Sequence, residues 1–160
     1  MTPPATARAA FVALAGLALL GSSCRKGPVC YPVRGQVFVG GKPAEGALVV
    51  FVPENALGLD APRPSTSVGA DGSFALRTYD SATRTVQDGA PPGRYAVTVV
   101  WQSEGARDPG GERTAEEIPD RLQGRYADPA TSKLRAEVKA GPNDLEPFQL
   151  PAAGLKGPKR

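Results

Sequence analysis

The stretch Pro92-Gly93-Arg94-Tyr95-Ala96-Val97-Thr98-Val99-Val100-Trp101-Gln102 decides the fold class of this chain. Its side chains alternate between two faces: one holds Tyr95, Val97, Val99 and Trp101, the other Ala96, Thr98 and Val100. Because successive side chains of a strand point to opposite faces, the pattern predicts a β-strand over Arg94–Gln102.

Six further short runs, separated by Gly, Pro, Asn and Asp, surround this strand in the sequence. We expect strands at Val33–Val39, Ala47–Val52, Ser65–Val68, Ser73–Tyr79, Lys133–Lys139 and Leu145–Leu150. The nearly continuous apolar character of Ala47–Val52 predicts a strand covered on both faces. Pro147 in the last run predicts an edge strand, since proline cannot donate to a sheet ladder.

Seven strands joined by turns, with no alternation of strands and helices, predict an all-β fold: a seven-stranded antiparallel β-sandwich with a long polar loop. The loop is Ser103–Ser132, in which Pro119–Gly124 has the proline start and glycine end of one helical turn. Alternation predicts a core formed by Val37, Val50, Phe51, Phe74, Leu76, Tyr95, Val97, Val99, Leu134, Val138 and Phe148.

The first 24 residues predict export. Arg8 precedes an apolar run, Ala9–Leu20, which is followed by small residues and Cys24. This order is typical of a signal peptide, and the run is too short to span a bilayer. A cysteine directly after the small residues is similar to bacterial lipoprotein signals, so we expect a leader at residues 1–23 and a diacylglyceryl group on Cys24. Leu20 stands one position further from the cysteine than is usual, and plain signal-peptidase cleavage is the alternative.

After the leader we expect an N-terminal stem at residues 24–32, one domain at 33–150 and a disordered tail at 151–160. The net charge is +3, and three cations lie in the last seven residues. The folded part is therefore close to neutral and has no basic stripe with interleaved aromatics, so no nucleic-acid partner is expected.

The chain has no histidine, which excludes Ser–His–Asp and Cys–His catalysis and imidazole zinc sites. The two cysteines, Cys24 and Cys30, are six positions apart. Lipidation of Cys24 would leave Cys30 as an odd thiol, whereas without lipidation a disulfide between them is sterically possible. We expect no metal site and no cofactor.

Acidic residues in the long loop raise the alternative of a hydrolase, since a pair of carboxylates can hydrolyse a glycosidic bond. Nothing in the sequence holds two of them at a fixed separation, so we expect a solvated loop and no catalytic residue. The acidic residues concerned are Glu104, Asp108, Glu112, Glu116, Glu117, Asp120 and Asp128. The Asp71-Gly72 pair indicates a turn rather than a calcium loop, because no dense run of oxygen ligands surrounds it.

Trp101 and Tyr126 are the candidate ligand-surface residues, because exposed aromatic rings serve as platforms for sugars. Trp101 shares its face with Tyr95, Val97 and Val99, a pattern more typical of a core or rim residue whose N–H finds a partner. Tyr126 lies in the polar loop, where it is either exposed or holds the loop against the sandwich.

Four segments carry a family resemblance, in the order opening strand, turn, second turn and central strand: Tyr31–Val37 (V-x-G-x-V), Gly41–Ala47 (G-x-P-x-x-G-A), Ala70–Phe74 (D-G-x-F) and Pro92–Val99 (P-G-x-Y-x-V-x-V). Together they resemble the carboxypeptidase regulatory-like family, which implies a transthyretin-like or immunoglobulin-like sandwich. With Asp88–Gly93, Trp101 and Arg125–Pro129, the chain is similar to small one-domain bacterial lipoproteins.

The resemblance implies a non-catalytic lipoprotein of the cell envelope or cell surface, with a structural or binding module. Its expected partners are a membrane, reached through the lipid anchor, and an envelope protein or polysaccharide. The alternative is a carbohydrate-binding module that uses exposed aromatic residues.

Overall fold

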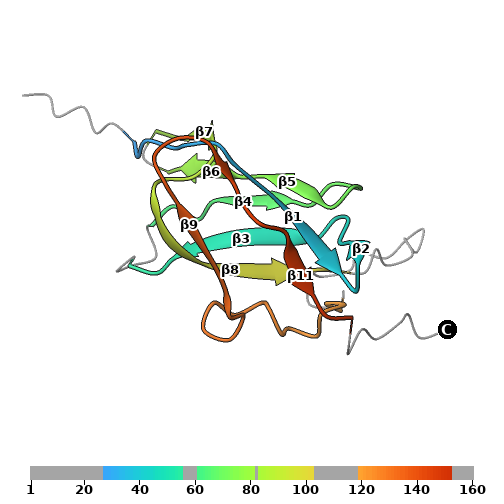
Figure 1. The fold of residues 1–160 in the computed structure, drawn as a ribbon. Helices are drawn as coiled ribbons and strands as arrows, with labels where there is room; N and C mark the ends of the chain where they lie inside the picture. The colour runs from blue at the N-terminus through green and yellow to red at the C-terminus, as the bar shows by residue number, and fades with distance from the viewer. Residues whose placement is uncertain (1–26, 56–60, 82, 103–118, 153–160) are drawn as a thin grey trace, which may run out of the picture.

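The computed structural model describes residues 27–55, 61–81, 83–102 and 119–152. These residues form eleven β-strands and no helix, arranged in two sheets around one hydrophobic core (Figure 1). The predicted all-β sandwich is confirmed at this level, whereas the predicted number of seven strands is not. The predicted leader and Cys24 lie outside the described residues, as does most of the predicted tail.

The larger sheet has six strands, and all of its pairs are antiparallel. Its order is β7 (Thr85–Asp88), β6 (Arg77–Asp80), β4 (Ser65–Ser67), β3 (Leu48–Pro53), β8 (Gly93–Val100) and β9 (Leu134–Val138). The strand that decided the fold class, β8, is central and pairs with β3 over six residues.

The smaller sheet is built on β1 (Val33–Val39) and is mixed. β1 pairs antiparallel with β2 (Lys42–Pro43) and β5 (Ser73–Ala75), and parallel with β10 (Asn143–Asp144) and β11 (Phe148–Leu150). The parallel pairs correct the expectation of a purely antiparallel sandwich: the chain after β9 turns back and runs alongside β1 in the same direction. Among the described strands β11 pairs with β1 alone, which makes it an edge strand, as Pro147 just before it predicted.

The predicted strand Ser73–Tyr79 is wrong, because this stretch is shared between the two sheets. Its first part, β5, pairs with β1, and its second part, β6, pairs with β4 and β7. Leu76, buried between them, marks the point where the chain crosses from one sheet to the other. The sequence pattern also missed β7, whose only large apolar residue is the exposed Val86.

Most of the predicted core is confirmed, and the exceptions lie on β3 and near the sheet edges. Val49 and Phe51 are fully buried, whereas Val50 is only partly buried and Leu48 is 44% exposed. Val50 was therefore wrongly assigned to the core. Adjacent side chains of a strand point to opposite faces of the sheet, so Val50 points away from the face that holds Val49 and Phe51. The expectation that this strand is covered on both faces is likewise wrong at Leu48. Leu134 and Phe148 pack against the core while partly exposed.

Candidate functional site

The Trp101 side chain is buried at the end of the central strand, with only 6% of its surface exposed. Its indole Nε1–H donates to the Glu45 carbonyl at 2.8 Å. The Arg121 guanidinium lies over the ring, with its Cζ 3.6 Å from the ring centroid, a cation–π arrangement. Both the polar edge and one face of the ring are therefore occupied within the protein.

Asp120 organises the chain beside Trp101. Its Oδ1 accepts from the backbone N–H groups of Trp101 (2.9 Å) and Leu122 (3.0 Å), and its Oδ2 accepts from that of Gly124 (2.8 Å). The single helical turn predicted over 119–124 is instead a series of turns. Asp120, expected to be one of the solvated loop carboxylates, thus satisfies three backbone donors.

Tyr126 is partly buried and packs against the core, next to the fully docked Leu122, which is 4% exposed. The Tyr126 carbonyl accepts from the Val99 N–H at 2.9 Å, so this segment extends the edge of β8. Of the two alternatives for Tyr126, the structure favours the one in which it holds the loop against the sandwich. The part of the loop at 103–118 lies outside the described residues.

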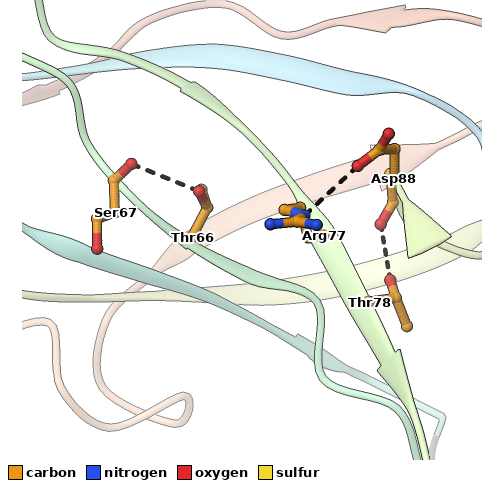
Figure 2. A network of polar contacts seen from close by, with 6 residues as sticks. Thr66, Ser67, Arg77, Thr78 and Asp88 are labelled. Carbon is orange, nitrogen blue, oxygen red and sulfur yellow. Dashed lines mark hydrogen bonds and ion pairs between the residues drawn. The ribbon is translucent and has the colours of Figure 1, made fainter. Parts of the chain in front are cut away.

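Among the described residues, Tyr79 is an exposed aromatic side chain that sequence reasoning missed. It is 57% exposed on β6 and lies directly opposite Val86 of β7, which is 52% exposed. Beside it, Arg77 pairs with Asp88 at 3.4 Å, and the buried Thr78 hydroxyl donates to the Gly89 carbonyl at 2.7 Å (Figure 2). Alternation along the chain could have indicated this exposure. If Phe74 and Leu76 point into the core, the odd-numbered Tyr79 points outward.

The described part of the predicted stem, residues 27–32, lies against the sandwich. Tyr31 and Ala90 exchange two backbone hydrogen bonds, each of 2.9 Å. Gly89 makes this close approach possible, because a Cβ at this position would overlap the Tyr31 carbonyl. Gly27 lies against the side chain of Asp80, a buried carboxylate that accepts from the Thr83 hydroxyl at 2.7 Å.

Where the stem meets the sandwich, prolines line an apolar recess of about 380 Å³. Its lining includes Pro28, Pro53, Pro62, Pro91, Pro92 and Tyr95. The Tyr95 hydroxyl donates to the Pro91 carbonyl at 2.6 Å. Burial raises the pKa of Tyr95 to about 12, and the nearby Cys30 side chain adds to the shift. Cys30 itself is a free, half-buried thiol.

A second, open and more polar groove of about 780 Å³ runs between β1, β4 and β5. Arg34, Gln36, Thr66, Ser73 and Asp144 contribute its polar groups. Across the described ranges, no three His, Cys, Asp or Glu side chains are grouped so that they could hold a metal ion. The Asp71 carboxylate accepts from the Ser73 N–H (3.0 Å) and hydroxyl (2.7 Å), which confirms a turn and lowers its pKa.

Comparison of the chain with protein-family models, with curated proteins and with solved structures finds no match. The resemblance to carboxypeptidase regulatory-like domains therefore stays a prediction. Within the described residues, no helix is long and apolar enough to cross a membrane.

Proposed function

We propose that this protein is a non-catalytic lipoprotein of the bacterial cell envelope. In this proposal Cys24 carries the lipid, and a β-sandwich of transthyretin-like kind serves a structural or binding role on the periplasmic side or the cell surface. The sequence support is the run from Arg8 to Cys24, with its cation, apolar stretch and small residues.

The observation that carries the proposal is Cys24 directly after the small residues that end the apolar run. The described chain lies against the sandwich at Gly27, three positions after Cys24, and is bonded to Ala90 at Tyr31. A lipid on Cys24 would therefore hold the domain by a short and firmly attached segment. Two acyl chains anchor a protein stably to a bilayer, and Arg25 and Lys26 next to the anchor favour an anionic surface.

Labelled fatty acid tests the anchor directly. The wild-type protein should incorporate the label and fractionate with membranes, whereas Cys24→Ala should lose both properties because the acceptor thiol is gone. Cys30→Ala is the matched control and should behave as the wild type does. A Cys24→Ala protein that still takes up label and still sediments with membranes would refute the lipoprotein assignment.

Tyr79 keeps carbohydrate binding as a second candidate function. With 57% of its surface exposed it offers an open ring, whereas Trp101 is covered by Arg121. Under this alternative, Tyr79→Ala should abolish retention of the protein on envelope polysaccharide, while Trp101→Phe should leave it unchanged. Equal retention of the Tyr79→Ala and wild-type proteins would remove the aromatic-platform hypothesis at this position.

A further inference from the structure

The length of chain between Cys24 and the fold limits how far the sandwich can lie from a lipid on that cysteine. Gly27 lies close to the side chains of Asp80 of β6 and Gln87 of β7. Three residue steps separate it from Cys24, and fully extended chain spans at most about 3.6 Å per residue, so the distance is at most about 11 Å. The headgroup layer of a bilayer is itself roughly 5–8 Å thick. The end of the sandwich that holds Gly27 is therefore the end nearest the membrane.

Exposed apolar side chains gather at this same end. Among the described residues, four large apolar side chains are exposed: Val29 (68%), Tyr79 (57%), Val86 (52%) and Leu48 (44%). Val29 belongs to the stem. Tyr79 and Val86 lie at the same end of β6 and β7 as Asp80 and Gln87, which Gly27 approaches, but on the outer face of the sheet. Leu48 lies at the other end of β3, where it pairs with Val100. Figure 1 shows the described chain starting beside β6 and β7 and ending at the opposite end of the molecule.

The chemistry of this end suits the interface of a bilayer. Tyrosine is enriched at the headgroup level, where its ring meets apolar surface and its hydroxyl meets water. Arg84 is exposed in the turn between β6 and β7 and adds a positive charge. Of the acidic groups on these two strands, Asp80 is buried and Asp88 is paired with Arg77, so neither opposes an anionic surface strongly.

We infer that the sandwich rests on the bilayer through its stem end, with Val29, Tyr79, Val86 and Arg84 in contact with lipid headgroups. The inference rests on the proposed lipidation of Cys24. It assigns the opposite end of the sandwich, with Leu48, Trp101 and the β1–β2 turn, to the aqueous side. A ligand or partner protein would then approach from that side.

Photo-crosslinking to lipid tests the contact. The full-length, lipidated protein is placed in vesicles of phosphatidylethanolamine and phosphatidylglycerol, with benzoylphenylalanine substituted at one position at a time. Val29, Tyr79 and Val86 are the test positions. Leu48 is the matched control, because it is an exposed apolar residue on the same face of the same sheet, about 14 Å from the level of Tyr79 along the strand direction. We expect lipid adducts at the three test positions in severalfold higher yield than at Leu48.

Two readouts separate this inference from the proposed function. Fatty-acid label on Cys24 together with equal lipid adducts at Leu48 and Tyr79 would overturn the orientation and leave the lipoprotein assignment standing. Adducts to protein alone at Tyr79 and Val86 would overturn it as well. Absence of label on Cys24 would refute the proposed function, and the inference falls with it. A Cys24→Ala protein should lose the lipid adducts at all four positions.

Discussion

The stem at 27–32 and the loop segment at 119–132 are both connectors in the sequence, yet the sandwich holds them in different ways. The stem is held by its backbone, through the two hydrogen bonds between Tyr31 and Ala90. The loop segment has backbone bonds to β8 as well, but side chains add to them: Asp120 accepts three backbone N–H groups, and Leu122 is buried in the core.

This difference determines where each attachment is vulnerable. An attachment through backbone hydrogen bonds requires no particular side chains in the attached segment, so it leaves no sequence pattern there. The position at which a substitution would disturb it is on the other side of the contact, at Gly89. A side-chain attachment concentrates the sensitivity in one residue of the segment, Asp120. Substitutions at these two positions therefore test whether the two connectors are held as described.

Gly89→Ala should have the largest effect on stability. The new Cβ would overlap the Tyr31 carbonyl, and the φ of +94° is one that a residue with a side chain rarely adopts. Moving the stem away would also disturb the buried bond from Thr78 to the Gly89 carbonyl. We expect a loss of about 4 kcal/mol or more, a large share of the ~5–15 kcal/mol that stabilises a typical domain. Denaturant unfolding measures the loss.

Gly46→Ala separates backbone conformation from close approach. Its φ is +76°, yet no heavy atom lies within 4 Å of an added Cβ. It should therefore cost only about 1–2 kcal/mol, the strain of the left-handed conformation. Similar losses for Gly46→Ala and Gly89→Ala would contradict the backbone attachment of the stem.

Asp120→Ala should come next, because it leaves the N–H groups of Trp101, Leu122 and Gly124 without their acceptor. Water can replace part of what is lost, so we expect a decrease of about 2 kcal/mol in the free energy of unfolding. Asp128→Ala is the control. Among the described residues one backbone N–H, that of Ala130, donates to its carboxylate at 2.7 Å, so this substitution should cost about 0.5 kcal/mol. Equal losses would show that Asp120 does not hold the segment.

Periodicity predicted the long alternating strands and could not predict pairing partners. β1 has the predicted bounds, and the inward face of β8 is as the alternation of Tyr95, Val97 and Val99 indicated. The crossing at Leu76 was missed because a strand that changes sheets keeps its alternation while its hydrogen-bond partners change. The parallel pairing of β10 and β11 was missed for a related reason, since two- and three-residue strands carry almost no periodic signal.

At the candidate sites, the sequence predicted residue types better than their surroundings. The interpretation of Trp101 as a core or rim residue with a partnered N–H agrees with its bond to Glu45. Asp120 could not be singled out, because its role depends on Trp101, which is nineteen positions earlier in the chain. The clustering of Val29, Tyr79 and Val86 likewise depends on the docking of the stem, which no local pattern records.

An effect that appears only at high pH sharpens the comparison, because it reports on the stem without altering its backbone. Tyr95 lies in the recess that Pro28 helps to line and beside Cys30, so the docked stem contributes to its burial. Its pKa is about 12 in the folded protein and near 10 when the chain is unfolded. Between these values the unfolded chain releases a proton that the folded protein keeps, so stability is fully present below pH 10 and falls as the pH rises towards 12.

Denaturant midpoints measured from pH 9 to pH 12 should show this decrease in the wild-type protein. Tyr95→Phe has no proton to release at this position and should show a smaller decrease. The contribution of Tyr95 to the tyrosinate absorbance, which develops near pH 12, should be lost in this variant, while the other three tyrosines still contribute. If the two proteins lose stability equally over this range, the stem does not shield Tyr95, and the attachment of the stem is looser than that of the loop segment.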